Sequence, residues 1–301
     1  MSLSLRRKKA EYMNISGKTK ICGLIGDPVE HTMSPVMHNA AFDKLGLEYA
    51  YLPFRVSPEE LPQAVSGLRA LNARGFNVTI PHKVAVIPLL DELDPLAEKI
   101  GAVNTVVNDN GVLKGYNTDA SGFLQALLER GVEPKDKNIV LLGAGGAARA
   151  IAYILAEQDA RLTILNRREE LDWAEAIAAN IRKDLRKDID VFELLPEYLE
   201  KALESANILA NATSIGMSPA SGVSLVPSQL IKSGLVVVDI VYNPVRTKLL
   251  QDAAVAGAVT VEGLDMLVWQ GALAFEKWTG EKPPFDLMKE VALRGLDKNE
   301  K

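Results

Sequence analysis

Residues 140–171 read VLLGAGGAARAIAYILAEQDARLTILNRREEL, and the glycine-rich turn near their start decides the fold class. This turn, GAGGAA over 143–148, follows an apolar run and matches the pattern G-x-G-x-x-A. A helical stretch comes next, and a second apolar run ends at Asn166. A strand, such a turn, a helix and a second strand in this order are typical of a dinucleotide-binding unit of the Rossmann type.

The small residues at three positions of the turn can be explained physically. Gly143 permits the tight bend, Gly145 lets the backbone approach a pyrophosphate, and Ala148 keeps the helix close to the strand. The phosphates would lie at the helix N-terminus, where free N–H groups and the helix dipole favour anions. Two other interpretations stay open, namely a close-packed turn without a ligand and another ligand of this fold, such as a methyl donor.

The end of the second strand bears on the choice of dinucleotide. An Asp or Glu at this place commonly binds the ribose 2′-hydroxyl of NAD, but the residue here is Asn166. Arg167 and Arg168 follow, and a guanidinium suits the 2′-phosphate of NADP. Glu169 could instead reach the ribose or repel a phosphate. The stretch therefore predicts that both cofactors are used, although a solvated turn with no such role is the alternative.

Length and composition limit the classes of protein. A chain of 301 residues suits two domains of about 100–200 residues each. Its formal net charge of −5 predicts no nucleic-acid partner, and no apolar run reaches the ~20 residues that would predict a membrane span. Cys22 is the single cysteine, so we expect no disulfide and no metal site, but a buried thiol in a reducing, cytoplasmic compartment.

The first residues are polar and basic. They read MSLSLRRKKAEYMNISG over 1–17, and no apolar segment follows the positive charges as it would in a secretory signal. We interpret this stretch as a disordered tail, whose beginning could come from a cloning vector. An organellar targeting peptide is the weaker alternative.

Strand-like and helical patterns alternate along the rest of the chain. Before residue 120 they include Asn110-Gly111, which predicts a hairpin between two short strands. From Ser121 a helix leads to Gly131, and a second series of strands and helices follows. The residues after 264 have apolar faces at helical spacing. The alternation predicts an α/β fold with mostly parallel strands, and the last helices could cross back onto the first domain.

Four short pieces before residue 120 place polar residues among apolar ones. They are GDPVEHTMSP, NVTIPHK, GAVNTV and GYNTDASG. Each has an ordinary structural interpretation: two helix caps at Thr32 and Ser34, a strand residue at Thr79, a solvated charge at Lys83 and a turn residue at Asn104. Together they supply hydroxyls, an amide, an ammonium and a carboxylate, and that set suits a small polyhydroxylated acid.

These four pieces, followed in order by GAGGA, NRR and WQGA, resemble the shikimate dehydrogenase family, including its quinate/shikimate branch. The resemblance implies a substrate domain over 1–119, a Rossmann domain for NADP or NAD over 120–263, and helices over 264–301 that return to the first domain. The implied activity is the oxidation of shikimate to 3-dehydroshikimate, with quinate as a further candidate substrate. Whether the protein is a monomer or a homodimer stays open.

The same resemblance implies a role for individual residues. Lys83 and Asp119 would be the catalytic pair. The residues implied to bind the substrate are Thr32, Ser34, Thr79, Asn104, Tyr242 and Gln270. The residues implied to bind the cofactor are Gly143, Ala144, Gly145, Gly146, Ala147, Asn166, Arg167, Arg168, Glu169, Ser214, Ile240 and Gly263.

General chemistry agrees with the catalytic pair. Reduction of a ketone by hydride builds negative charge on oxygen, which a lysine ammonium can stabilise and to which it can give a proton. Whether Lys83 is the acid/base or mainly an electrostatic anchor stays open. A regulator of the same fold that binds a metabolite without turnover is a rival interpretation, and the presence of both Lys83 and Asp119 disfavours it. A dehydrogenase for a folate or amino-acid substrate would not explain NVTIPHK together with GYNTD.

Three departures from the family pattern matter. Thr32 stands where the pattern His-Ser-x-Ser-Pro has its first Ser, so the hydroxyl is kept and a methyl is added. NADP-strict members read Asn-Arg-Thr with a later basic residue, whereas this chain has Arg168 and Leu171 at those places. His82 stands where other residues, often Phe, are common in the family; we interpret it as a packing or surface residue, and a role in tuning Lys83 is the alternative.

Overall fold

Two six-stranded sheets organise the part of the chain that the computed structural model describes, residues 15–299. The first sheet has the order β2-β1-β3-β5-β6-β4. Its strands are β1 (Lys20–Gly26), β2 (Tyr49–Arg55), β3 (Gly75–Val78), β4 (Glu92–Leu93), β5 (Thr105–Asp109) and β6 (Val112–Tyr116). The sheet is parallel except where β5 pairs with β3 and β6. The hairpin predicted at Asn110-Gly111 joins β5 to β6, with positive φ at both residues.

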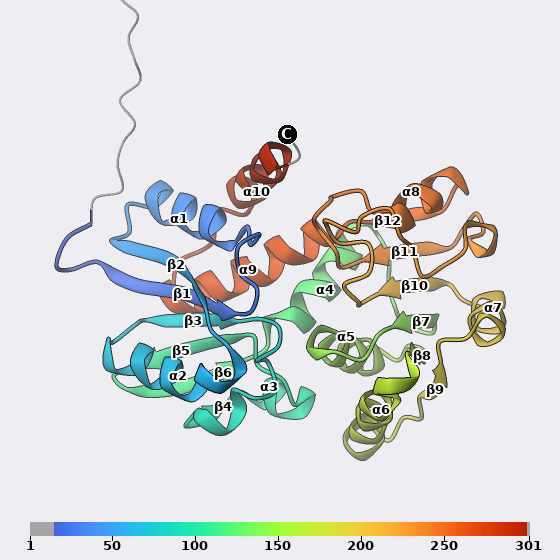
Figure 1. The fold of residues 1–301 in the computed structure, drawn as a ribbon, viewed down its shortest axis with the longest axis horizontal. Coiled ribbons are helices and arrows are strands. Elements are labelled where there is room, and N and C mark those ends of the chain that lie inside the picture. Colours follow the sequence, from blue (N-terminus) through green and yellow to red (C-terminus); the bar gives the residue numbers. More distant parts are fainter. Residues whose placement is uncertain (1–14, 300–301) are drawn as a thin grey trace, which may run out of the picture.

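Helices cover both faces of this sheet (Figure 1). Alternate residues of β1 point to opposite sides, so Cys22 and Leu24 pack with helices α1, α9 and α10, while Ile25 packs with α2 and α3. The Cys22 thiol is buried, as expected, and burial raises its pKa. The bounds are α1 (Ser34–Lys44), α2 (Leu61–Ala70), α3 (Pro95–Ile100), α9 (Gly263–Thr279) and α10 (Phe285–Asn299).

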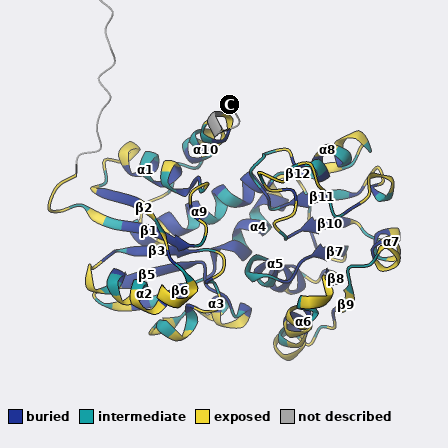
Figure 2. Ribbon diagram, viewed as in Figure 1, coloured by how far each residue is buried: buried dark blue, intermediate teal, exposed yellow. Residues whose placement is uncertain are grey.

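The second sheet is the predicted Rossmann sheet. Its order is β12-β11-β10-β7-β8-β9 with every pair parallel, which is the strand order 3-2-1-4-5-6 in reverse. Its strands are β7 (Asn138–Leu142), β8 (Arg161–Asn166), β9 (Asp190–Glu193), β10 (Ile208–Asn211), β11 (Val236–Asp239) and β12 (Val259–Val261). The buried strands are the dark centre of this half of the molecule in Figure 2.

Its two faces are also covered by helices. Ile139 and Leu141 of β7 pack with α5 (Gly146–Glu157) and α6 (Leu171–Leu185), whereas Val140 and Leu142 pack with α7 (Pro196–Glu204) and α8 (Lys248–Val255). The described part of the chain also contains the one-turn helices η1 (Pro58–Glu60), η2 (Ile87–Leu89), η3 (Arg168–Glu170) and η4 (Ser228–Leu230).

Helices α4 (Thr118–Glu129) and α9 lie between the two sheets (Figure 1). They approach closely at Gly122, where a Cβ would lie 2.8 Å from the Gln270 backbone nitrogen. Helix α10 then packs on α1 of the first unit. The predicted fold class, including the return of the C-terminal helices, is thus confirmed. The domain boundaries near 119 and 263 stay predictions.

Some local expectations need adjustment. The tail predicted over 1–17 lies, for residues 1–14, outside the described residues, and Ser16 and Thr19 form a hydrogen-bonded turn. Helix α4 begins at Thr118 rather than near Ser121, because the Asn117 side chain accepts a hydrogen bond from the Ala120 N–H. Between residues 15 and 299, no helix is long and apolar enough to cross a membrane.

Candidate active site

Lys83 and Asp119 form an ion pair between the turn after β3 and the first turn of α4. Lys83 lies in the turn after β3, where its carbonyl accepts a hydrogen bond from the Val103 N–H at 2.8 Å, and Asp119 lies in the first turn of α4. The Lys83 Nζ donates to Asp119 Oδ2 at 2.6 Å. The two side chains are only 12% and 6% exposed, so this is a partly desolvated ion pair with limited access to water.

Asn104 fixes the other oxygen of Asp119. Its Nδ2 donates to Asp119 Oδ1 at 2.8 Å, and its Oδ1 accepts from the Thr118 N–H at 2.7 Å. Gln270 reaches the same group from α9, with its Oε1 3.4 Å from Asn104 Nδ2. The carboxylate is therefore oriented by an amide whose own direction is set by the start of α4.

Two hydroxyl groups lie next to each other at the start of α1. The Thr32 and Ser34 hydroxyls lie 3.2 Å apart, and Met33, not Ser34, occupies the helix cap. Ser34 is the first helical residue and does not cap the helix; its hydroxyl accepts a hydrogen bond from the Thr32 hydroxyl instead. Burial raises the pKa values of Tyr51 and Tyr242, while hydrogen bonding to Ser34 and to Thr32, respectively, opposes that rise. These hydroxyls together form a neutral donor set that suits a carboxylate.

Thr79 follows β3 and is half buried. A Cβ on Gly26 would lie 2.2 Å from its Cγ2, so β1 and the end of β3 approach each other closely beside the Lys83 turn. His82 is buried, and its Nε2 lies 2.7 Å from the Val56 carbonyl oxygen. His82 is thus a packing residue that ties the Lys83 turn to the segment after β2.

The glycine turn after β7 fits a dinucleotide. Gly143 has φ +101°, and a Cβ there would lie 2.8 Å from Thr213 Cγ2, so only glycine fits. Gly145 precedes α5 without a side-chain cap, which leaves the first N–H groups of the helix for an anion. Gly146 adjoins the first unit, since its Cβ would lie 3.1 Å from the Cβ of Lys83. The glycine turn and the lysine therefore lie side by side.

The turn after β8 contains the residues expected at the adenosine end. Asn166 Nδ2 donates to the Glu170 carbonyl at 2.6 Å, and Arg167 forms an ion pair with the Glu170 side chain. Arg168 and Glu169 are exposed. Glu170 was not among the residues expected at the site, which ended at Glu169.

Three further residues are expected near the cofactor, of which Ile240 and Gly263 are expected beside the nicotinamide; they follow β10, β11 and β12. Ser214 is exposed in the loop after β10, and Ile240 follows β11. Gly263 begins α9, and a Cβ there would lie 2.5 Å from the Ile240 carbonyl oxygen. Ile240 and Gly263 are therefore in close contact.

Comparison with known proteins decides the family. A curated relative in Dehalococcoides mccartyi, named shikimate dehydrogenase (NADP(+)), is 48% identical over 279 residues, which is 93% of this chain and 97% of the relative. The chain belongs to the shikimate dehydrogenase family. Family models for the shikimate dehydrogenase substrate binding domain and the shikimate 5′-dehydrogenase C-terminal domain match residues 24–106 and 263–293.

Solved members of the family have the same fold. A crystal structure of a shikimate dehydrogenase in complex with NADP+ has a TM-score of 0.89 and 45% identity, and the match covers 94% of this chain and 98% of that one. A quinate dehydrogenase from Corynebacterium glutamicum in complex with NAD has a TM-score of 0.84 and 31% identity, with 92% and 99% covered. The predicted resemblance, including that to the quinate branch, is confirmed.

Two further buried polar residues, which the motifs did not single out, are hydrogen-bonded to the candidate site. Asn77 Oδ1 accepts from the Tyr51 hydroxyl at 2.7 Å, and Asn77 Nδ2 donates to the Asn104 carbonyl at 3.1 Å. Asn77 lies in the stretch NVTIPHK, so its position was a usable signal. Tyr51 lies on β2, and its contact with Asn77 depends on the pairing of β1 with both neighbours.

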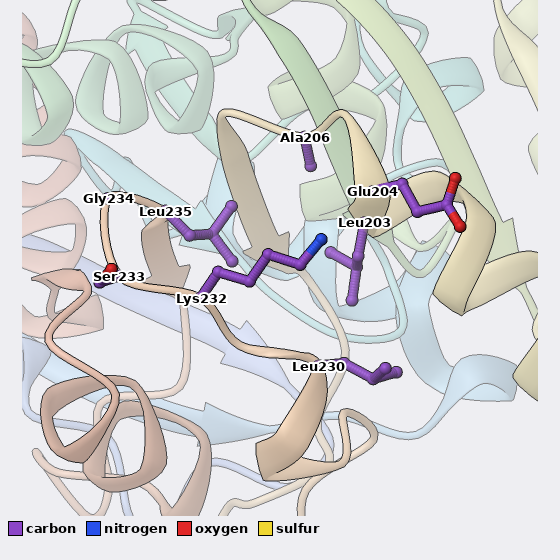
Figure 3. A pocket seen from close by; sticks show the side chains of 8 residues that line it. All are labelled: Leu203, Glu204, Ala206, Leu230, Lys232, Ser233, Gly234 and Leu235. Atoms are coloured by element: carbon purple, nitrogen blue, oxygen red, sulfur yellow. The ribbon is translucent and has the colours of Figure 1, made fainter.

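A hollow on the opposite edge of the Rossmann sheet is unrelated to these groups. It has a volume of about 210 Å³ and is lined by Leu203, Glu204, Ala206, Leu230, Lys232, Ser233, Gly234 and Leu235 (Figure 3). These residues precede β10 and β11, at the amino ends of the strands. Dinucleotides bind at the carboxyl ends in this fold, so we do not place the cofactor there.

Proposed function

We propose that this protein oxidises shikimate reversibly to 3-dehydroshikimate, with NADP+ as hydride acceptor. The observation that carries the proposal is the Lys83–Asp119 pair, 2.6 Å apart, next to the glycine turn through the contact with Gly146. A proton-transfer pair and a phosphate-binding turn at one place are what hydride transfer between a nicotinamide and an alcohol requires. The name and the NADP+ complex of the relatives support this choice.

The residues divide the work as follows in this proposal. Thr32, Ser34 and Tyr242 bind the substrate carboxylate, while Thr79, Asn104 and Gln270 hold ring hydroxyls. Bound NADP+ supplies the hydride acceptor. The hydride of the reacting C–H bond would pass to NADP+. The proton of the hydroxyl group on the same carbon would pass toward the Lys83–Asp119 pair. Lys83 serves there either as the proton carrier or as the electrostatic anchor of the oxygen.

The cofactor binds, in this proposal, along the carboxyl edge of the Rossmann sheet. Ala144 to Ala147 hold the pyrophosphate, and Asn166 to Glu169 hold the adenosine ribose. The free N–H groups of α5 and the close approach at Gly143 fit such a ligand. We further propose that NAD+ also serves, because Arg167 is partly engaged by Glu170 and Glu169 lies next to it. The NAD complex of the quinate dehydrogenase supports this second cofactor.

We propose three further features on the same basis. The substrate domain is 1–119, the cofactor domain is 120–263, and 264–301 complete the first. Shikimate is preferred to quinate because the Thr32 methyl narrows the carboxylate site. The protein works in the cytoplasm, where its buried lone thiol stays reduced.

One assay tests this function. Initial rates of nicotinamide reduction are measured with shikimate and quinate, each with NADP+ and NAD+. We expect turnover of shikimate with both cofactors, with specificity constants within about 100-fold of each other. Tight binding of shikimate without turnover would support the regulator and contradict the enzyme.

A further inference from the structure

Asp239 is a buried carboxylate that the proposed mechanism does not use. It ends β11, directly before Ile240, and its side chain is 0% exposed. In the register of the sheet it pairs with Asn211, the last residue of β10. Both residues thus lie at the carboxyl edge, where the loops that carry Ser214, Ile240 and Tyr242 begin.

Three donors converge on this carboxylate. Oδ1 accepts from Asn211 Nδ2 at 2.9 Å and from the Val241 N–H at 3.0 Å, and Oδ2 accepts from the Thr247 hydroxyl at 2.6 Å. All three partners are neutral, and burial raises the pKa of Asp239 while these hydrogen bonds oppose the rise. A carboxylate can accept all three bonds at once because it has no hydrogen of its own.

The network continues from Asn211 into the loop after β10. Asn211 Oδ1 accepts from the Thr213 N–H at 3.1 Å and from its hydroxyl at 2.7 Å, and Thr213 Oγ1 accepts from the Ile215 N–H at 3.1 Å. Ser214 lies between these two anchored residues. The Thr213 methyl also lies next to Gly143, where a Cβ would be only 2.8 Å from it, so the same network borders the glycine turn.

On the other side, Asp239 holds the loop after β11. The bond to the Val241 N–H fixes the backbone between Ile240 and Tyr242, and Thr247 caps α8 by accepting from the Leu250 N–H at 3.3 Å. The two loops also meet directly, because the Ser218 N–H donates to the Asn243 carbonyl at 2.8 Å. One carboxylate therefore joins the loop of Ser214 to the loop of Ile240 and Tyr242.

We propose that Asp239 is a positioning residue that holds these two loops in one arrangement around the nicotinamide half of the cofactor. The proposal rests on the proposed function for the identity of the ligand. Its consequence is a division of the cofactor site. The nicotinamide half depends on the Asp239 network, whereas the adenosine half depends on the turn after β8, at the other side of β7.

A matched pair of variants at Thr247 tests this division. Thr247→Val removes the hydroxyl bound to Asp239 and keeps the shape, whereas Thr247→Ser keeps the hydroxyl and removes only the methyl. Asp239→Asn is a third variant that removes the charge. Three quantities are measured for each folded protein: the dissociation constants of NADP+ and of adenosine 2′,5′-bisphosphate, and kcat with shikimate. Adenosine 2′,5′-bisphosphate lacks the nicotinamide half.

We expect Thr247→Val and Asp239→Asn to weaken NADP+ binding by roughly 10-fold and to lower kcat by roughly 10- to 100-fold, as ångström-scale misplacement does. Adenosine 2′,5′-bisphosphate should bind within about 2-fold of the wild-type value, and Thr247→Ser should match the wild type in all three quantities. If Asp239→Asn does not fold, the comparison of Thr247→Val with Thr247→Ser tests the proposal.

Two results would overturn the proposal. Equal weakening of NADP+ and adenosine 2′,5′-bisphosphate would show that the network only stabilises the sheet. Unchanged NADP+ binding and kcat in Thr247→Val would show that the loops do not need it. The binding measurements require no turnover, so failure of the proposed shikimate activity in the wild type would be recognised separately.

Discussion

His38 is a histidine in the core whose two ring nitrogens have no hydrogen-bond partner among the described residues. Its side chain is 0% exposed, and its ring stacks on Tyr51 with centroids 4.5 Å apart. Trp278 and Phe275 enclose it from α9. Burial without a partner lowers the pKa of His38 to about 3, so it is neutral in the folded protein at physiological pH.

This residue predicts an acid-sensitive stability. Its folded pKa of about 3 lies below the ~6.5 of an unfolded chain, so acidification protonates the unfolded state first. Stability contributed by the neutral form is present above pH ~6.5 and is lost by about 1.4 kcal/mol per pH unit below it. We expect His38→Leu to reduce the loss of unfolding free energy between pH 7 and pH 5 by about 2 kcal/mol, as measured by denaturant titration. Parallel pH profiles for the two proteins would refute this role of His38.

Thr32 predicts the choice between two substrates. Its hydroxyl donates to the Ser34 hydroxyl at 3.2 Å, and we expect its methyl to occupy space in the proposed carboxylate site. Quinate has an additional hydroxyl on the carbon that carries the carboxylate. We expect Thr32→Gly, and Thr32→Ser as the variant that keeps the hydroxyl, to raise the specificity constant for quinate relative to shikimate by about 1–3 kcal/mol in transition-state free energy. No relative gain for quinate in either variant would exclude this explanation.

At the scale of elements, the turn from β8 into η3 predicts the choice of cofactor. Arg167 is the only guanidinium of this turn that the structure pairs, and its partner is Glu170. A 2′-phosphate must therefore compete with Glu170 for Arg167. We expect Arg167→Ala to shift the ratio of specificity constants toward NAD+. Glu169→Thr and Glu170→Gln should shift it toward NADP+, each by up to roughly 10-fold.

The wild-type ratio is the reference for these three variants. The ratio of kcat/KM for NADP+ to that for NAD+ is measured at fixed, saturating shikimate. A wild-type discrimination of several thousand-fold in either direction would contradict dual use of the cofactors. A shift toward NAD+ in Glu170→Gln would contradict the competition for Arg167.

Local elements could be predicted from the sequence where their own residues determine the backbone conformation. The turn GAGGAA and the pair Asn110-Gly111 determine their own backbone, because positive φ and close approach require particular residues. The cap of α1 was less predictable, since Ser34 has the right side chain but Met33 takes the cap position. Glu170 was missed because its pairing with Arg167 depends on the one-turn helix η3, which no strong sequence signal marks.

At the scale of the whole molecule, α4 and α9 bring the site together from distant parts of the chain. Gly122 and Gln270 touch, and Gln270 in turn reaches Asn104 at 3.4 Å. Their contact could not be predicted from either segment alone, because Gly122 reads as an ordinary helix glycine. The order of motifs allowed the residues to be proposed, but their distances and the bonds through Asn77 follow only from the packing of β1, β3, α4 and α9.

This contact gives a prediction with an internal control. Gly122→Ala would place a Cβ 2.8 Å from the Gln270 backbone nitrogen, so α9 must move. We expect a loss of about 1–3 kcal/mol in unfolding free energy and a raised KM for shikimate. Gly67→Ala, in α2 with nothing within 4 Å of the new Cβ, should stabilise by up to about 1 kcal/mol and leave KM unchanged. Equal effects of the two substitutions would contradict the role of the α4–α9 contact.

The central claim is that Lys83, paired with Asp119, takes part in the oxidation of shikimate. The most direct measurement is the rate of NADP+ reduction by shikimate in wild type, in Lys83→Ala and in Lys44→Ala, which alters an exposed lysine of α1. Circular dichroism and NADP+ binding confirm that each variant is folded. We predict that the wild type and Lys44→Ala turn over alike and that Lys83→Ala is slower by about 100-fold or more. A folded Lys83→Ala protein that binds NADP+ and turns over near the wild-type rate would contradict the claim.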